Sequence, residues 1–470
     1  MNRNHNENYE EFGDAMSQNI KRFESMLENN ESQYLDEIAY ESISNFYMEK
    51  GEWEMANKAC QLGLEQFPYS LELILNSVQL KINTMEFEEA MELLDRASTF
   101  FPFDQEAIFM RGVVYNLLGE YDEAISVFEN AIHSSDQKDE IEFQLGQVYQ
   151  NKNEFGRAIE HYKKALKRGY SNELIFYEMI FCADFDNRLE EEVEYFRSLT
   201  DEDPYSQLAW FGLGIVCQRL DKVEEAIQAF EFASVIKDDF ASAWFNLANC
   251  YLRAENYTKA RDAYLKTEEL EEPSAELFTH LGTISEKLEE YGEAYQYYRK
   301  AADLEDTWDE AWFGMASVLY EQEKFLEAVH FVKKAIDLNK INGEYWLLLG
   351  DLEARIGNLV SSHESYARAA ELDPENVDIW LNWSLIYFEQ STYSKAVEIL
   401  EDGLSSVPEE ADIYYRLTVY LIFDGQYNEA YKYLQEALIL DFDGHEQIYS
   451  FFPSLQTQKA LNRIIEQNRP

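Results

Sequence analysis

Tyr121-Asp122-Glu123-Ala124 is one copy of a pattern that recurs along this chain of 470 residues. A large apolar or aromatic residue returns every 34 residues, at Trp53, Phe87, Tyr121, Phe155, Leu189, Val223, Tyr257, Tyr291, Phe325, Leu359, Tyr393 and Tyr427. Three residues after each of these stands an alanine, except at Glu192 and Ser362. No step is longer or shorter than 34, so twelve repeats fill residues 37–444 without insertion.

Each repeat predicts two helices. Trp244, Leu247 and Tyr251 have the 3- and 4-residue spacing of one helix face, and Ala124 and Phe128 have it in the second half of a repeat. The prolines of the array all fall in the connection after the second helix, where a missing N–H does no harm. They are Pro68, Pro102, Pro204, Pro273, Pro374 and Pro408.

This pattern resembles the tetratricopeptide repeat (TPR) family, whose signature runs W-x2-L-G-x2-Y, then A-x3-F, then A and P. Trp210, Leu213 and Gly214, followed by Ala226 and Phe230, form one match. A second match consists of Trp346, Leu349, Gly350, Tyr366, Ala369 and Pro374. The resemblance implies an all-α fold, a TPR solenoid in which about twelve helix-turn-helix repeats form one elongated right-handed superhelix.

The two ends of the chain fit a capped array. Residues 1–36 are expected to form a polar segment with a capping helix over 9–29, and 37–444 to form the twelve repeats. Residues 445–470 are expected to form a degenerate half-repeat over 445–452, ended by Pro453, and a C-terminal capping helix over 454–467.

The formal charge of the chain is −52, from 39 basic and 91 acidic residues. Residues 1–36 carry −5 and residues 445–470 carry +1, so the repeats carry −48. This balance argues against nucleic acid and against anionic membranes as partners, because both need a basic surface. Two interpretations stay open: acids that keep a long array soluble, or an acidic field that recruits a basic partner.

No motif for chemistry is present. The seven histidines form no metal-binding spacing, and glycine-rich phosphate loops and the nucleophile elbow are missing. The sequence therefore predicts no enzyme, no catalytic residue, no metal and no cofactor. Cys60, Cys182, Cys217 and Cys250 form no paired spacing. With no secretory signal and no apolar run long enough for membrane insertion, a cytoplasmic location is expected.

By resemblance, the first helix of each repeat lines a concave groove that binds a partner. The fifth position of the repeat gives a row of rings, at Phe109, Phe143, Tyr177, Phe211, Phe245, Phe313 and Tyr415. These rings are either a floor for a peptide or packing between repeats. Arg219, Arg253 and Lys287 form a basic column, which either grips an anion or pairs with acids of the adjacent helix. The candidate partner-binding residues are Phe211, Arg219, Phe245, Asn246, Asn249, Arg253, His280, Lys287 and Phe313.

Two further sets of apolar residues replace polar ones on the groove side. The first set is Phe181, Phe185 and Ile215, and the second is Leu385, Phe388, Val419, Ile422 and Phe423. An exposed patch of this size would be a surface for interaction or self-association. For the second set, the alternative is that the C-terminal cap buries it. The lysines of the groove clamp that binds chaperone carboxyl termini are absent, so that adaptor role is not expected.

The predicted function is a non-catalytic protein-interaction scaffold or adaptor that binds a partner peptide or helix in the concave groove. The alternatives are a regulator that responds to a peptide or an anion, and an assembly chaperone for basic client proteins. The partner is a protein or peptide, basic under the second interpretation of the charge. The sequence leaves the oligomeric state open.

Overall fold

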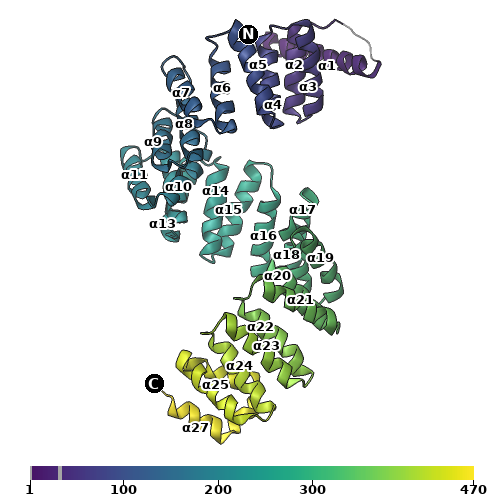
Figure 1. Cartoon of the computed structure of the whole chain (residues 1–470), viewed down its shortest axis with the longest axis vertical. Coiled ribbons are helices and arrows are strands. Elements are labelled where there is room, and N and C mark those ends of the chain that lie inside the picture. Colours follow the sequence, from purple (N-terminus) through teal and green to yellow (C-terminus); the bar gives the residue numbers. More distant parts are fainter. Residues whose placement is uncertain (1–2, 30–33, 470) are drawn as a thin grey trace. The chain divides into compact units, whose positions relative to one another are not determined.

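A computed structural model describes residues 3–29 and 34–469 of the chain (Figure 1). Of the predicted end segments, residues 1–2, 30–33 and 470 lie outside the described residues. The described residues are helical and contain no β-strand, which confirms the predicted all-α class. The chain forms two compact units, the N-terminal unit (residues 1–237) and the C-terminal unit (residues 238–470). None of the described helices is long and apolar enough to cross a membrane.

Pairs of antiparallel helices follow one another with the period that the sequence predicts. The first helices of the pairs are α2 (Glu37–Glu49), α4 (Leu71–Asn83), α6 (Gln105–Leu118), α8 (Lys138–Asn151), α10 (Leu174–Phe185), α12 (Gln207–Arg219), α14 (Ala241–Arg253), α16 (Ala275–Lys287), α18 (Asp309–Glu321), α20 (Gly343–Arg355), α22 (Val377–Glu389) and α24 (Ala411–Phe423).

The second helices are α3 (Trp53–Gln66), α5 (Phe87–Phe100), α7 (Tyr121–Ala131), α9 (Phe155–Lys167), α11 (Leu189–Glu202), α13 (Val223–Ile236), α15 (Tyr257–Leu270), α17 (Tyr291–Leu304), α19 (Phe325–Leu338), α21 (Leu359–Leu372), α23 (Tyr393–Ser406) and α25 (Tyr427–Leu440). Each begins at the large apolar or aromatic residue that defines the 34-residue step. The division of the chain into a leading segment, the repeats and a trailing half-repeat stays a proposal.

Tryptophans near the start of five first helices tie their helix pairs to the preceding connection. The indole N–H of Trp312 donates to the Asp306 carbonyl at 2.9 Å, and that of Trp380 donates to the Pro374 carbonyl at the same distance. Trp210 makes the corresponding bond to Pro204. Each bond spans six residues and satisfies a turn carbonyl that the helix cannot use. The signature tryptophan thus fixes the angle at which the chain enters a new pair.

Glycines in the first helices let rings of the second helices approach the backbone. A Cβ atom on Gly146 would lie 2.4 Å from the Tyr162 ring, and one on Gly214 would lie 2.5 Å from the Phe230 ring. Both rings are fully buried. The small residues of the repeat therefore serve close helix packing, which supplies most of the stability of an amphipathic helix.

The two ends differ in detail from the sequence prediction. The N-terminal helix α1 (Arg3–Asn29) begins six residues earlier than expected, and its Phe23 and Met26 are buried against α2. The expected C-terminal helix over 445–452 is the shorter α26 (Glu446–Phe451), after the 3₁₀ turn η1 (Asp443–His445). The expected helix over 454–467 is divided into η2 (Pro453–Thr457) and α27 (Lys459–Gln467), because the backbone of Gln458 between them is extended (φ −76°, ψ 104°).

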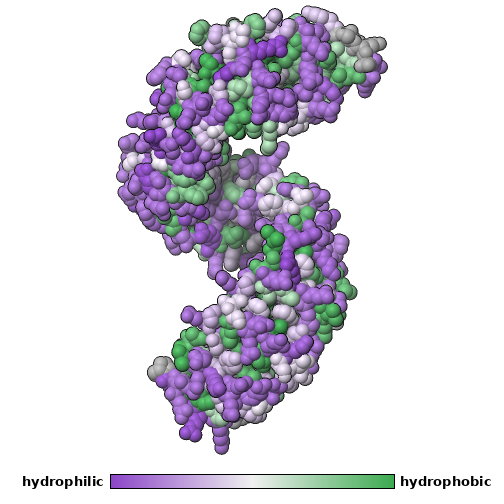
Figure 2. Space-filling model, viewed as in Figure 1, coloured by the Kyte–Doolittle hydropathy of each residue, from purple (hydrophilic) through white to green (hydrophobic). Residues whose placement is uncertain are grey.

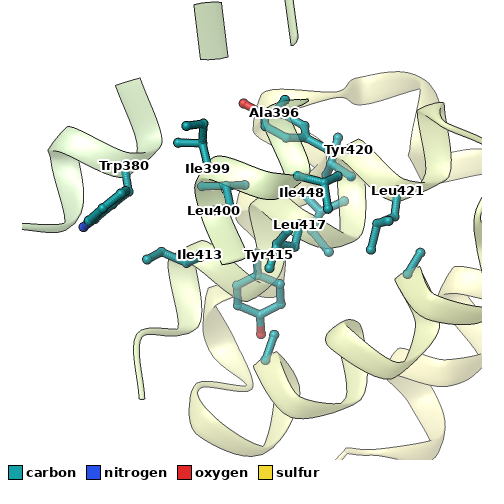
Figure 3. Packing of buried hydrophobic residues seen from close by; sticks show 14 of the residues in the cluster. Trp380, Ala396, Ile399, Leu400, Ile413, Tyr415, Leu417, Tyr420, Leu421 and Ile448 are labelled. Carbon is teal, nitrogen blue, oxygen red and sulfur yellow. The ribbon is translucent and has the colours of Figure 1, made fainter. Parts of the chain in front are cut away.

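The C-terminal segment packs against the last helix pairs (Figure 3). Phe388 of α22 stacks on Tyr420 of α24 with ring centroids 4.4 Å apart, and Phe452 lies 5.2 Å from Phe388. Ile448 is buried in the same cluster. The second apolar set of the sequence is therefore covered mainly by the chain's own C-terminal segment, the second of the two interpretations. Phe423 keeps 40% of its surface exposed.

Candidate partner-binding groove

A cavity of about 1090 Å³ lies along three first helices of the N-terminal unit, α4, α6 and α8. Its apolar lining comes from Ile82, Phe103, Phe109, Met110 and Val113. Its acidic lining comes from Asp104, Glu106, Asp136, Asp139 and Glu140. We call this cavity the acidic groove. Its helical residues lie on first helices, which by family resemblance line the concave groove.

Carboxylates dominate the electrostatics of the acidic groove, and no lysine or arginine is among the described residues that line it. Burial raises the pKa of Glu106, and the neighbouring charges of Glu72 and Asp104 raise it further. Burial also raises the pKa of Glu140, with a further contribution from Asp139. These carboxyl groups are partly desolvated and repel one another, so a bound cation would relieve an existing electrostatic cost.

The rim of the acidic groove is built by a helix cap. Asp104 precedes α6, and its Oδ1 accepts a hydrogen bond from the backbone N–H of Ala107 at 2.9 Å. This is the usual role of aspartate before a helix, and it holds the carboxylate at the groove edge. Phe103, the residue before the cap, is 89% exposed and stands beside it.

A cluster of rings lies on α9 and α10 of the N-terminal unit. Phe181 and Phe185 of α10 are 47% and 61% exposed, and their ring centroids are 4.8 Å apart. Phe155 of α9 lies 5.3 Å from Phe185, and Tyr177 is 41% exposed. We call these four residues the α10 aromatic cluster. Ile215, the third member of the first apolar set, is buried. Figure 2 shows mostly hydrophilic residues on the face it displays, with hydrophobic residues in small patches between them.

The nine predicted site residues are divided between the two compact units. Phe211 and Arg219 belong to the N-terminal unit and the other seven to the C-terminal unit. Phe211 is fully buried, with Phe176 and Phe230 at ring-centroid distances of 5.7 Å. Its ring therefore packs between helices, so we leave it out of the proposed site. The Arg219 guanidinium donates to the Asp184 carboxylate of α10, which is the pairing with an adjacent acid that one interpretation predicts.

In the C-terminal unit, three predicted residues meet around Tyr264. The His280 ring stacks on Tyr264 at 5.3 Å, and Phe245 lies 5.6 Å from the same ring. The Tyr264 hydroxyl donates to the Asn249 side chain. Burial lowers the pKa of His280, which keeps its ring neutral at pH 7. These groups form a packed aromatic cluster with a polar edge.

The remaining predicted residues do not join that cluster as one site. The Asn246 amide donates to the Ser242 carbonyl of its own helix at 2.8 Å. The Phe313 ring stacks on Tyr345 at 4.7 Å. Arg253 and Lys287 are exposed at the ends of α14 and α16. The residues that line the acidic groove, in contrast, were not among the predicted site residues, although the sequence shows that acidic residues recur at the same position of successive repeats.

A metal site and a reactive thiol both place requirements on the histidine, cysteine and carboxylate side chains. The described residues contain no group of three or more His, Cys, Asp or Glu side chains placed to hold a metal ion. The four cysteine side chains are buried, and burial raises the pKa of Cys182 to about 12 and that of Cys217 to about 11. A thiol with a raised pKa is a poor nucleophile at neutral pH, so these cysteines serve packing.

A desolvated carboxylate in the C-terminal unit gives a testable pH dependence. Asp351 accepts hydrogen bonds from Tyr366 and Asn382, and burial raises its pKa to about 6. Because its pKa is higher in the folded than in the unfolded chain, the folded state binds the proton more tightly. Its unfavourable contribution to stability is therefore present above pH 6 and disappears as the pH falls towards 4.

We expect Asp351→Asn to stabilise the C-terminal unit by about 1–2 kcal/mol at pH 7. The amide removes the desolvated charge, and its oxygen can still accept the hydrogen bond from the tyrosine hydroxyl. The gain should vanish near pH 4, where the wild-type carboxyl is protonated. Urea midpoints between pH 4 and pH 7.5 measure it. Glu364→Gln, an exposed change on α21, is the control and should show little pH-dependent gain. A constant difference across this range would contradict the assignment.

Solved structures with similar helical arrangements include several TPR proteins. "YrrB: a TPR protein with an unusual peptide-binding site" is 21% identical, covers 40% of this chain and 96% of its own, and has a TM-score of 0.34. "APC/C hetero-tetramer Cut9-Hcn1" is 14% identical, covers 84% and 96%, and has a TM-score of 0.40. MamA is 17% identical, covers 34% and 94%, and has a TM-score of 0.33.

No curated protein matches the sequence significantly. Family models described as tetratricopeptide repeat match residues 82–139, 143–168, 209–239, 241–273, 275–307 and 313–377. Together these stretches span slightly more than half of the chain, and they follow the helix pairs described above. The chain therefore belongs to the tetratricopeptide repeat family.

Proposed function

We propose that this protein is a non-catalytic scaffold that binds a basic, partly apolar segment of a partner protein in the acidic groove of α4, α6 and α8. TPR proteins bind protein or peptide partners and generally act without catalysis. The observation that carries the proposal is the lining of the groove, which combines five carboxylates with an apolar floor. A lysine- or arginine-containing segment would satisfy the carboxylates while its apolar side chains cover the floor.

Size and position support a peptide over a small molecule. The volume of about 1090 Å³ lies at the upper end of the range of roughly 300–1000 Å³ that is usual for small-molecule sites, and the groove extends over three helices, so it can take several side chains of a peptide. The α10 aromatic cluster, on α9 and α10 of the same unit, offers further apolar surface. Exposed rings gathered in one place are typical of interaction surfaces.

The experiment uses a fluorescein-labelled peptide of alternating lysine and leucine, with the full chain in 150 mM salt. We expect the double variant Glu106→Lys, Glu140→Lys to bind this peptide at least about tenfold more weakly, because two attractive charges become repulsive. Fluorescence anisotropy measures the affinity. The control is Glu123→Lys, Glu129→Lys on α7, which makes the same charge change at exposed positions outside the groove. It should stay within about twofold of the wild type.

Equal losses in the groove variant and the control would contradict the groove as the site. That result would favour the acidic surface as a whole as the attraction, which is the assembly-chaperone alternative for basic clients.

A further inference from the structure

A second pocket of the N-terminal unit has the opposite character. It has a volume of about 560 Å³ and lies between the last turns of α9, the helix α11 and the start of α12. Its floor is apolar and includes Phe176, Phe196 and Leu199. Lys163, Lys164 and Lys167 line one wall. We call it the lysine pocket.

The lysines of this wall belong to a segment whose net charge is positive, opposite to that of the whole chain. Residues 152–168 hold six basic and two acidic residues in a protein with a formal charge of −52. Four of the six bases have carboxylate partners within 4.0 Å, namely Lys152, Arg157, Lys163 and Arg168. The other two, Lys164 and Lys167, have no ion pair among the described residues, and both line the pocket. Their charges are therefore not neutralised by the neighbouring helices and face the pocket.

Lys163 holds the wall in place and is a positioning residue. Its ammonium lies 2.8 Å from Oε1 of Glu192, which is fully buried, and 4.2 Å from the centre of the Tyr195 ring. Both partners belong to α11, so the contacts join α9 to α11. Lys164 and Lys167 stand one turn apart at the exposed C-terminal end of α9 and keep their ammonium groups available.

The pocket exists because the α10–α11 pair departs from the repeat. Ile180 and Leu199 stand where other pairs have small residues such as Gly146 and Ala165. The large residue at position 180 keeps the Phe196 ring away from the helix backbone there. Phe196 retains only the contact with the next pair, at Gly212 of α12, where a Cβ atom would lie 2.4 Å from the ring. Accordingly α11 packs more closely against α12 than against α10, and the lysine pocket opens beside it.

We propose that the lysine pocket binds an acidic, apolar segment of a partner protein, with its carboxylates on Lys164 and Lys167 and its apolar side chains on the floor. Charge complementarity selects this occupant, because the two lysines are the unpaired charges of the wall. The opposite rim carries Glu202 and Asp203, and Asp203 already accepts a hydrogen bond from the Tyr205 backbone. The carboxylates of the segment must therefore face α9, which fixes its orientation.

This site is distinct from the acidic groove, so the chain would hold two segments of opposite charge at once. The probe is a fluorescein-labelled peptide of alternating glutamate and leucine, tested with the full chain by fluorescence anisotropy. We expect saturable binding to the wild type and at least a thirtyfold loss for Lys164→Glu, Lys167→Glu. The milder Lys164→Gln, Lys167→Gln should give an intermediate loss and guards against misfolding of the charge-reversed variant. Glu202→Gln should bind about threefold more tightly, because it removes the repulsive charge on the opposite rim.

The matched control is Lys432→Glu, Lys459→Glu, which makes the same charge change at exposed positions of the C-terminal unit. It should bind within twofold of the wild type. An equal loss in the control, or no saturable binding to the wild type, overturns the proposal. So does self-association of the wild type that the Lys164→Glu, Lys167→Glu variant abolishes, since the occupant is then a second copy. The groove variant Glu106→Lys, Glu140→Lys should keep its affinity for the glutamate–leucine peptide, so either proposal can fail alone.

Discussion

Gly314→Ala should lower the stability of the α16–α18 layer by about 2 kcal/mol, although alanine is the better helix former. A Cβ atom at position 314 would lie 2.4 Å from the Tyr298 ring, which real contacts do not allow. The ring cannot retreat, because a Cβ on Gly282, on its other side, would lie only 2.7 Å from it. Its hydroxyl also donates to Glu286 at 2.9 Å. The steric cost therefore exceeds the gain of about 1 kcal/mol in helix propensity.

The chain offers a matched control for this change. Gly292 lies on α17, the same helix as Tyr298, and a Cβ there would meet nothing within 4 Å. Gly292→Ala should therefore stabilise by up to about 1 kcal/mol. Urea unfolding and hydrogen exchange of the α16–α18 amides measure both variants, because repeat arrays open segment by segment. Tyr298→Leu should recover part of the loss in the Gly314→Ala background. Equal stability of the two glycine variants would contradict this packing argument.

The helix pairs could be predicted because their signals are local and repeated. The large residue that opens each second helix and the alanine three residues later identify the pattern without tertiary information. The turn inside each pair could be predicted from part of the array only. Its left-handed position holds a glycine in four repeats, but Glu255, Glu289 and Glu323 have φ values of +56°, +61° and +58° there. In these repeats the two packed helices impose a conformation that the residue type alone does not indicate.

The candidate site was harder to predict, since the burial of a side chain depends on neighbours in space that the sequence does not show. Phe211 and Tyr177 occupy the same repeat position, yet the first is fully buried and the second is 41% exposed. Arg219 finds its partner Asp184 one helix pair earlier, a contact that the repeat spacing allows but does not demand. Glu106 and Glu140, in contrast, belong to a row of acids that the sequence displays. Only the cavity beside them shows that this row faces a groove.

The C-terminal segment closes the array through a few aliphatic side chains. Leu461 and Ile465 of α27 are buried in the cluster that includes Leu455 and Ile448. The ring of Phe451 also lies 3.7 Å from the Arg416 guanidinium of α24. Without this segment, the rings of α22 and α24 would face water. A short terminal helix has no other source of stability, since isolated helices of this length do not persist in water.

Leu461→Asp should therefore release α26 and α27 from the array. The change forfeits about 2–3 kcal/mol of apolar burial and adds the larger cost of placing a carboxylate among aliphatic groups. The total, about 4 kcal/mol or more, exceeds what a nine-residue helix can offset. Hydrogen exchange should then report lost protection over residues 446–467, and size-exclusion chromatography should report association through the uncovered rings. Arg463→Asp, at an exposed position two residues away, introduces the same side chain and should leave protection unchanged. If both variants keep the segment protected, its packing on α22 and α24 does not depend on Leu461.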